Sequence, residues 1–366
     1  MTTLLSARQI GDQFDHAHVD ELRYLHCALE TGLSGTSSMV SMYERGLAEL
    51  YDMPHALAVS SGTAAVAVAM SALDCQPGDE VLIAPSCPVC TVLPLLALGL
   101  RPVFCDVMPD SFGLDVTQLD KSLSSRTRAV IEVPMWGYPT PVAPLREFAD
   151  AHGLALVLDL AHCHLTRLGG RWLAAYAEIA CFSTHEGKFL STGEGGFVLC
   201  KSAAVDARMR AWSRFGNLDG RTPGVNLKLG GLAAAVGVAR LEAVHRHRAW
   251  RLRHREAILS RLENPHVREL PMPEGGEING YALLLQTVDS DGRRLVEHQV
   301  AQGVPSDVGK YDNQPLYNYP LLAHLRRDCP RAASLLRSLT TVPLHPGLDA
   351  GDIDHIVQIL NDYRPA

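Results

Sequence analysis

The sequence predicts an α/β protein with a mainly parallel sheet sandwiched by helices, followed by a smaller C-terminal α/β domain. Short apolar runs alternate with helical patterns through the first half of the chain. These runs are apolar on both faces, as expected of strands that helices cover on both sides. The chain has 366 residues, more than one core usually organises, so we expect domains at residues 1–245 and 246–366.

The expected strands of the sheet are short apolar runs in chain order. They are ALAVS at 56–60, EVLIAP at 80–85, PVFCDV at 102–107, AVIEVP at 129–134, LALVLDL at 154–160, a strand that ends at Phe182, and GGFVLC at 195–200. Helical patterns such as TAAVAVAMSAL and PLREFADAHG separate most of them. This alternation is typical of a parallel sheet built from strand–helix–strand units.

The second half of the chain has a different pattern. A long helical stretch starts near Leu229 and could bridge to the second domain. After it, YALLLQTV reads as a strand, RRLVEHQVAQG as a helix that ends at Gly303, and DIDHIVQILNDY as a closing helix.

Composition and charge exclude several classes of function. Apolar residues make up 47% and charged residues 20%, the net charge is −7 and the pI is about 6.1. A basic excess typical of nucleic-acid binding is absent, so a small-molecule substrate is expected. The N-terminus lacks the pattern of a signal peptide, and apolar runs such as Thr91–Leu100 are too short to span a bilayer. We expect a cytoplasmic protein without a membrane segment.

The first candidate for chemistry is the Ser-Ser-Gly-Thr segment at 60–63. Gly62 permits a tight turn before a predicted helix, whose first N–H groups favour a phosphate. Ser61 and Thr63 add hydroxyl groups. A plain helix N-cap is the alternative interpretation.

The second candidate is Asp159, at the end of the predicted strand LALVLD. Ligand sites in α/β sheets lie at the carboxyl ends of strands, and a carboxylate there can keep a pyridinium nitrogen protonated. His162 and His164 follow closely and could line the same site. Taken alone, Asp159 is better explained as a helix N-cap or a salt-bridge partner, and either imidazole could equally be structural.

The third candidate is Lys188 in the segment CFSTHEGKFLSTGEGG at 181–196. Small residues and turns flank this lysine, and Ser183 follows the preceding strand. Lysine amines of lowered pKa form Schiff bases with aldehydes. An exposed loop lysine is the alternative interpretation. A cofactor site is favoured because three features follow one another along the chain: a phosphate-binding loop, a carboxylate at a strand end and this lysine.

With these motifs, the sequence resembles the DegT/DnrJ/EryC1/StrS family of sugar and cyclitol aminotransferases, which depend on pyridoxal 5′-phosphate (PLP). The resemblance covers nearly the whole chain, from SSGTAAVAVAMSAL through HGLALVLDLAHCH and FSTHEGKFLSTGEGG to VPLHPGL. It implies a type I (aspartate aminotransferase-like) fold with a seven-stranded-type sheet.

The resemblance also implies roles for individual residues. Lys188 would form the Schiff base with PLP and shuttle the proton, Asp159 would contact the ring nitrogen, and His162 would lie near the ring hydroxyl. The implied phosphate ligands are Ser61, Gly62, Thr63, Ser183 and, from the other subunit of a homodimer, Asn226.

Two departures from the family pattern concern the site. Val89 stands where the family usually has an aromatic residue that stacks on the cofactor ring. His185 and Glu186 precede Lys188 where small or polar residues are more usual. We therefore take His164, His185 and Glu186 as candidates for substrate contact.

The implied reaction moves an amino group from glutamate or glutamine to a keto sugar or keto cyclitol, in sugar or secondary-metabolite (antibiotic) biosynthesis. A PLP-dependent epimerase, lyase or dehydratase would keep the same Lys188 and Asp159 and stays open. A non-catalytic PLP- or sugar-binding regulator is a further alternative. A nicotinamide-dependent dehydrogenase is set aside because no G-x-G-x-x-G follows the first strand.

Nine cysteines, an odd and scattered set, predict free thiols rather than a disulfide framework. The CPVC segment at 87–90 could be a redox pair or half of a zinc site. Because a second CxxC at a suitable spacing is missing from the sequence, we expect no metal.

Overall fold

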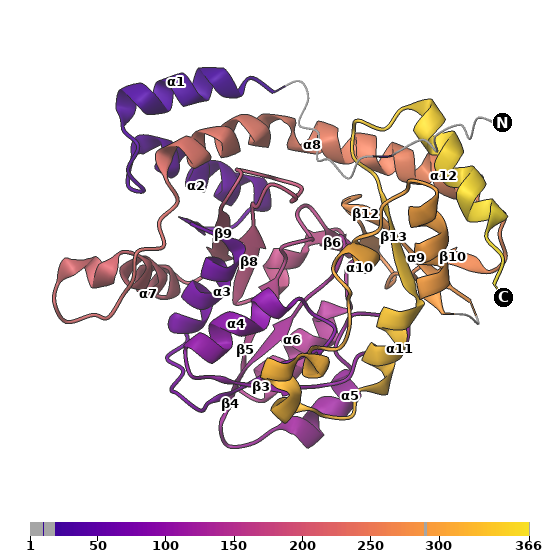
Figure 1. Cartoon of the computed structure of the whole chain (residues 1–366). Helices are drawn as coiled ribbons and strands as arrows, with labels where there is room; N and C mark the ends of the chain where they lie inside the picture. The colour runs from indigo at the N-terminus through magenta and orange to yellow at the C-terminus, as the bar shows by residue number, and fades with distance from the viewer. Residues whose placement is uncertain (1–9, 11–18, 289–290, 366) are drawn as a thin grey trace.

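The centre of the molecule is a seven-stranded sheet (Figure 1). The computed structural model describes residue 10, residues 19–288 and residues 291–365, so the N-terminal residues inspected for a signal peptide lie mostly outside it. The strand order is β1-β9-β8-β5-β4-β2-β3. The strands are β1 (His55–Val59), β2 (Glu80–Ile83), β3 (Arg101–Phe104), β4 (Thr127–Glu132), β5 (Ala155–Asp159), β8 (Ile179–Ser183) and β9 (Gly196–Cys200).

All neighbouring strands of this sheet run parallel except those that flank β9. β9 pairs antiparallel with β1 on one side and with β8 on the other. The predicted α/β class with a mainly parallel sheet is therefore confirmed. Each predicted run overlaps one observed strand, although β1, β3 and β4 begin one or two residues earlier than predicted. β8 extends one residue beyond Phe182 because Ser183 pairs with Gly196.

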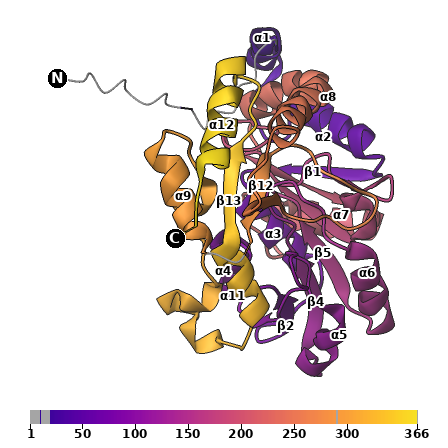
Figure 2. The same cartoon turned by 90° about the vertical axis from the view of Figure 1, so that its right-hand side faces the viewer.

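Helices cover both faces of the sheet. Figure 2 shows α3 and α4 on one face and α6 on the other. The helices of this part are α1 (Glu21–Thr31), α2 (Ser38–Tyr51), α3 (Gly62–Ser71), α4 (Val89–Ala97), α5 (Val116–Leu119), α6 (Val142–Ala151) and α7 (Ala203–Ser213). With both faces covered, the strands form one apolar core with residues such as Leu82, Ile131 and Leu158, all fully buried.

A single long helix, α8 (Gly231–Leu259), connects the two halves of the chain. Its first part packs against α1 and α2, and its last part reaches α12 (Figure 1). Gly237 lets α2 approach closely, because a Cβ there would lie 2.5 Å from a ring atom of Tyr43. The predicted boundary between residues 245 and 246 falls inside this helix, and the division into domains stays a prediction.

The C-terminal part has its own small sheet and its own apolar cluster. The sheet has the order β10-β12-β13, and a second three-stranded sheet of order β11-β6-β7 lies between the two parts of the chain. The elements are β6 (Arg167–Leu168), β7 (Arg171–Trp172), β10 (Val267–Glu269), β11 (Gly276–Glu277), β12 (Ala282–Thr287), β13 (Leu339–Pro343), α9 (Gly292–Ala301), α10 (Asp307–Lys310), α11 (Pro330–Ser338) and α12 (Ala350–Asp362). The separate cluster includes Leu283, Leu295 and Ile356.

The segment between α10 and β13 returns to the large sheet and lies across its strand ends. The Leu316 N–H donates to the Pro85 carbonyl, 2.9 Å away. At the start of α11, two backbone N–H groups donate to the Asp106 carboxylate, which follows β3, and the Arg331 side chain binds Asp106 and Asp115. These contacts hold the segment between α10 and β13 beside the carboxyl ends of β2 and β3.

None of the helices within the described part of the chain combines the length and the apolar character that a bilayer span requires.

Candidate functional site

A cavity of about 970 Å³ lies at the carboxyl ends of the parallel strands. All but two of the residues predicted for the site line it: Ser61, Gly62, Thr63, Val89, Asp159, His162, Ser183, His185, Glu186 and Lys188. We call the side made by residues 61–63, Asp159, His162, Ser183 and Lys188 the strand-end wall. The lining contributed by the C-terminal part, Tyr281 together with residues of the segment 307–319, is the C-terminal wall.

The first predicted motif lies at the start of α3. The Ala64 N–H donates to Ser61 Oγ at 3.0 Å, so Ser61 caps the helix while its hydroxyl stays at the cavity. A Cβ at position 62 would lie 2.6 Å from Ser183 Cβ, so glycine is needed where α3 meets the end of β8. Free helix N–H groups, Thr63 and the Ser183 hydroxyl thus converge where an anion can bind.

Asp159 ends β5 and is 6% exposed. Thr91 Oγ1 donates to its Oδ2 at 2.7 Å, and the Ala161 N–H donates to its Oδ1 at 3.1 Å. Burial raises the pKa of Asp159, while these hydrogen bonds and the charge of Lys188 oppose the increase. A buried carboxylate of this kind is well suited to accept a hydrogen bond from a positively charged N–H group of a ligand.

Lys188 lies in the turn after β8, on the same cavity. Burial lowers the pKa of Lys188, and Cys90, Asp159 and Asp307 act against that shift. A lowered pKa leaves more of the amine neutral and nucleophilic. Its backbone N–H donates to the His185 carbonyl at 2.8 Å, and its Nζ lies 5.7 Å from the centre of the Tyr281 ring.

His162 reaches the cavity as a neutral imidazole. Burial lowers its pKa well below the ordinary value. The Trp136 N–H donates to His162 Nδ1 at 3.3 Å, and the Tyr281 ring stacks on the imidazole at 4.7 Å with planes 15° apart. Tyr281 also donates through its hydroxyl to the Gly187 carbonyl at 3.2 Å, so it connects His162 to the turn that carries Lys188.

His164, predicted as a substrate contact, lies in the core instead of the cavity. Its side chain is fully buried between the edges of Phe182 and Phe197, and Nε2 is 2.9 Å from the Ser183 carbonyl. Burial lowers its pKa to about 3. The position two residues beyond His162 points away from the site, which the sequence spacing did not reveal.

His185 and Glu186 lie exposed at the rim of the cavity, as substrate contacts would. His185 Nε2 is 3.8 Å from Glu194 Oε1, so the rim holds an imidazole beside a carboxylate. Asn226 is also exposed but does not line the cavity, and its Oδ1 accepts a hydrogen bond from Lys228 Nζ at 2.6 Å. Its role toward a second subunit stays a prediction.

Several lining residues were missed by the sequence analysis. Thr91 stands in the apolar helix VCTVLPLLA, and a polar residue there needs a buried partner, which is the signal that could have identified it. The others give no such signal, because they reach the site from distant segments: Trp136, Tyr281, Asp307, Lys310, Tyr311, Asn313 and Gln314.

All nine cysteines lie within the described residues and are free thiols. Cys87 and Cys90 both line the cavity, and burial raises the pKa of each thiol. A protonated thiol is a poor nucleophile and a poor metal ligand. Among the residues that the structure describes, no group of three or more His, Cys, Asp or Glu side chains could hold a metal ion.

The chain is similar to known proteins along most of its length. The model of the DegT/DnrJ/EryC1/StrS aminotransferase family matches residues 16–361. GDP-perosamine synthase of Vibrio cholerae is 26% identical, over 94% of this chain and 96% of that protein. dTDP-3-amino-3,4,6-trideoxy-alpha-D-glucose transaminase of Streptomyces venezuelae is 28% identical, over 88% of this chain and 86% of that protein.

Two solved structures are similar as well. The structure of S. venezuelae DesV in complex with a ketimine intermediate matches with a TM-score of 0.86, at 26% identity and 93% coverage of both chains. DesI, solved in the presence of its TDP-sugar product, matches with a TM-score of 0.89, at 26% identity over 97% of this chain and 92% of that one.

Proposed function

The chain belongs to the DegT/DnrJ/EryC1/StrS aminotransferase family, and from this membership we propose its reaction and its cofactor. The protein transfers an amino group from glutamate or glutamine to a keto sugar or keto cyclitol. Its cofactor is PLP, held covalently by Lys188.

The observation that carries this proposal is the joint position of Lys188 and Asp159 on one cavity, with Asp159 acting on the charge of Lys188. PLP has three groups that need partners, and the residues fit each of them. Lys188 offers an amine of lowered pKa for the aldehyde, and Asp159 offers a buried carboxylate for the ring nitrogen. The α3 N-terminus with Ser61, Thr63 and Ser183 offers donors for the phosphate.

Bound PLP would supply an electron sink for the carbon that loses a proton. Asp159 would keep the ring nitrogen protonated, and Thr91 would fix the orientation of this carboxylate. Lys188 Nζ would remove the proton from the donor carbon and deliver it again as a general base and acid. His162, neutral and stacked on Tyr281, would lie along the edge of the ring without adding a second positive charge.

The rim residues suit a polyhydroxylated acceptor. His185, Glu186 and Glu194 present both donors and acceptors at the mouth of the cavity. The similar proteins named above are a perosamine synthase and an amino-deoxyglucose transaminase, which supports a sugar-type acceptor here. Asn226 and its exposed surroundings would complete the site of a second subunit, so we expect a homodimer.

The experiment that tests the proposal is an absorbance titration of the purified, PLP-loaded protein. Addition of glutamate or glutamine alone should convert the aldehyde form of the cofactor to the amine form and release one equivalent of the 2-oxo acid. Borohydride reduction followed by peptide mapping should place the cofactor on Lys188.

Two results would contradict it. Labelling at another residue would remove Lys188 from the role proposed. Retention of the aldehyde form with either donor, together with loss of water or inversion of a sugar substrate, would favour a lyase or an epimerase on the same scaffold.

A further inference from the structure

Lys188 is positioned differently from Asp159 and Ser183 of the same wall. Asp159 and Ser183 each close a buried strand, whereas Lys188 lies in the connection between β8 and β9, residues 184–195, which contains neither helix nor strand. We call this connection the lysine loop, and its tip is exposed at residues 185–186. An amine that must meet an aldehyde at bonding distance therefore needs some other means of fixing its position.

Two buried threonines join the arms of the lysine loop at its base. Thr184 is fully buried and Thr192 is 6% exposed, and their hydroxyl oxygens lie 2.6 Å apart. The Thr192 N–H donates to the Thr184 carbonyl at 2.7 Å, and the Thr184 N–H donates to the Gly195 carbonyl at 2.8 Å. Thr184 thus uses its N–H, its carbonyl and its hydroxyl to close the loop, and Lys188 lies midway between the two threonines.

The hydroxyl hydrogens of this pair have a defined direction, because each hydroxyl carries one hydrogen. Within the described part of the chain, Thr192 Oγ1 is the one hydrogen-bond partner of Thr184 Oγ1. Thr192 Oγ1 also lies 3.0 Å from the Glu194 carbonyl and 3.3 Å from the Thr184 carbonyl. Both hydrogens are satisfied when Thr184 donates to Thr192 and Thr192 donates to a carbonyl. In a buried chain of this kind, each hydrogen bond strengthens the next.

Gly195 shows how closely the pair is packed. A Cβ at position 195 would lie 2.5 Å from Thr184 Oγ1 and 2.5 Å from Thr192 Oγ1. Only a glycine lets the end of the lysine loop lie against both hydroxyl groups. The base of the loop therefore has little freedom to move while the pair is intact.

The pair acts beneath the site and not in it. Ser183 lines the cavity, but Thr184 and Thr192 do not. Successive side chains of an extended segment point in opposite directions, so the Ser183 hydroxyl faces the cavity and the Thr184 hydroxyl faces the core. Neither threonine can touch a substrate, and any effect on the reaction must pass through the backbone of the loop.

Two contacts from other segments hold the upper part of the lysine loop. The Tyr281 hydroxyl donates to the Gly187 carbonyl at 3.2 Å, and Arg240 Nη1 donates to the Ser191 carbonyl at 3.0 Å. These contacts fix single points on either side of Lys188. The separation of the two arms of the loop is left to the threonine pair.

We propose that Thr184 and Thr192 are positioning residues, which hold the lysine loop in the conformation that presents Lys188 Nζ to the cofactor aldehyde. This inference rests on the proposed function, because it presumes covalent attachment of PLP at Lys188. Removal of one hydroxyl should slow this attachment by about 3- to 10-fold, the size of effect expected of one buried hydrogen bond.

The test uses the full chain and two forms of the cofactor. PLP carries the aldehyde that reacts with a lysine, whereas pyridoxamine 5′-phosphate carries an amine in its place and binds without a covalent bond. Stopped-flow absorbance measures the rate of PLP attachment, and calorimetry measures the Kd of pyridoxamine 5′-phosphate. Hydrogen exchange followed by mass spectrometry measures the mobility of the lysine loop in the protein without added cofactor.

Thr184→Val and Thr192→Val each remove one hydroxyl and nearly keep the shape of the side chain. Each should slow PLP attachment and speed hydrogen exchange in the lysine loop by about 3- to 10-fold, while the Kd of pyridoxamine 5′-phosphate should change by less than about 2-fold. The double variant should lose little more than either single variant, because the two hydroxyls share one hydrogen bond. Thr184→Ser keeps the hydroxyl and should restore both rates.

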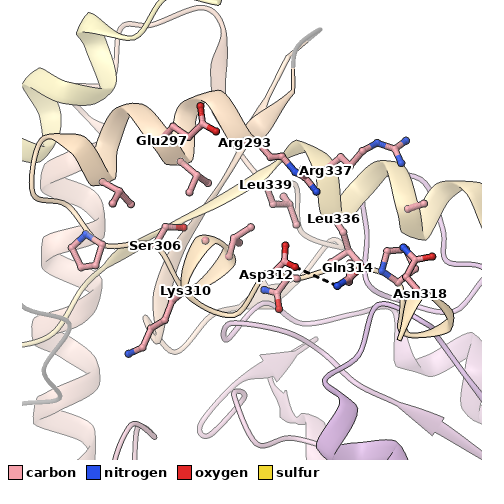
Figure 3. A pocket seen from close by; sticks show the side chains of 18 of the residues that line it. Arg293, Glu297, Ser306, Lys310, Asp312, Gln314, Asn318, Leu336, Arg337 and Leu339 are labelled. Carbon is pink, nitrogen blue, oxygen red and sulfur yellow. Dashed lines mark hydrogen bonds between the residues drawn. The ribbon is translucent and has the colours of Figure 1, made fainter. Parts of the chain in front are cut away.

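A matched control comes from a second buried hydroxyl pair, in the C-terminal part. Thr340 Oγ1 lies 3.0 Å from Ser306 Oγ, and Ser306 lines a second cavity of about 820 Å³ that residues of the C-terminal part form on their own (Figure 3). Thr340, like Thr184, is fully buried. Thr340→Val should therefore lower the Tm as the lysine-loop variants do, but leave PLP attachment and exchange in the lysine loop unchanged.

The results separate this inference from the proposed function. Unchanged exchange in the lysine loop of Thr184→Val overturns the positioning role, as does a loss of pyridoxamine 5′-phosphate affinity equal to the loss of PLP attachment. An equal effect of Thr340→Val overturns it too, because the effect would then follow stability alone. A wild-type protein that attaches no PLP at Lys188, although its lysine loop responds to the substitutions, contradicts the proposed function and leaves the threonine pair as the element that fixes the loop.

Discussion

The strand-end wall and the C-terminal wall face the same cavity but are built differently. On the strand-end wall, Asp159 and Ser183 close buried strands of the large sheet and are fixed by its backbone ladder. On the C-terminal wall, Lys310 and Tyr311 are exposed and stand on a single helical turn. Buried strand ends vary little in position, whereas exposed turns tolerate substitution.

The difference indicates a division of labour. Proton transfer and cofactor binding need fixed distances and a low dielectric, which the strand-end wall provides. Choice of substrate needs side chains that can change without disturbing the core, and the C-terminal wall provides those. Substitutions on the first wall should therefore change kcat, and those at residues 307–319 of the second should change KM for one substrate.

The largest effect is expected from Lys188→Ala. Without the amine, the protein loses both covalent attachment of the cofactor and the proton carrier, so kcat should fall by at least about 10³-fold. Steady-state assay and borohydride labelling measure the two losses. Lys121→Gln, at an exposed position that lines neither cavity, serves as the control. A Lys188→Ala protein that turned over at the wild-type rate would contradict the contrast between the two walls.

A smaller loss, of about 10²- to 10³-fold in kcat, is expected from Asp159→Asn, because a neutral amide cannot stabilise a protonated ring nitrogen. The affinity for the cofactor, followed by absorbance, should weaken in parallel. Thr91→Val removes only the hydrogen bond to Asp159 and should cost about 10-fold. If Thr91→Val proved as harmful as Asp159→Asn, orientation and not charge would be the main contribution of this pair.

Acid should weaken the folded state through the imidazole of His164, which is buried in the core behind Ser183 of the strand-end wall. The pKa of His164 is lowered to about 3 by burial, whereas in the unfolded chain it lies near 6.5. Between pH 7 and pH 5 the unfolded state takes up a proton that the folded state excludes, so the free energy of unfolding should fall by about 2 kcal/mol.

Denaturant unfolding at the two pH values measures this effect, and His164→Gln should remove it from the difference. An unchanged pH dependence in His164→Gln would mean that other groups, such as His162, carry the proton uptake.

The smallest effect is expected where the two walls touch. Tyr281→Phe keeps the ring over His162 and removes only the hydroxyl that donates to Gly187, so kcat should fall by about 2- to 5-fold. Tyr281→Ala also removes the stack and should have a several-fold larger effect on cofactor binding. Equal kcat and equal cofactor affinity in the two variants would show that the contact between the walls depends on the Tyr281 hydroxyl and not on its ring.

The sequence was sufficient to predict the large sheet, because its strands are unbroken apolar runs such as ALVLD and IACFS. It did not predict β13, the five-residue strand LTTVP. This strand follows α11 without an intervening loop, so no turn residue marks where the helix ends and the strand begins.

A similar limit applies to the site. Asp159, Ser183 and Lys188 could be predicted since each directly follows or closes a strand. Thr91 and Asp159 are 68 positions apart, and Tyr281 reaches His162 across an even larger part of the chain. Such pairs depend on tertiary structure, and for the same reason His164 could not be distinguished from His162 by spacing alone.

The length of α8 has a mechanical consequence. A helix of 29 residues is roughly 44 Å long, and this one contains no proline that could act as a joint. Because α8 packs against α1 and α2 near one end and against α12 near the other, we expect it to oppose rotation of one half of the chain relative to the other. If the two halves keep their relative position, we expect the segment at 311–319, which lines the cavity, to be the part that moves when reactants enter and leave.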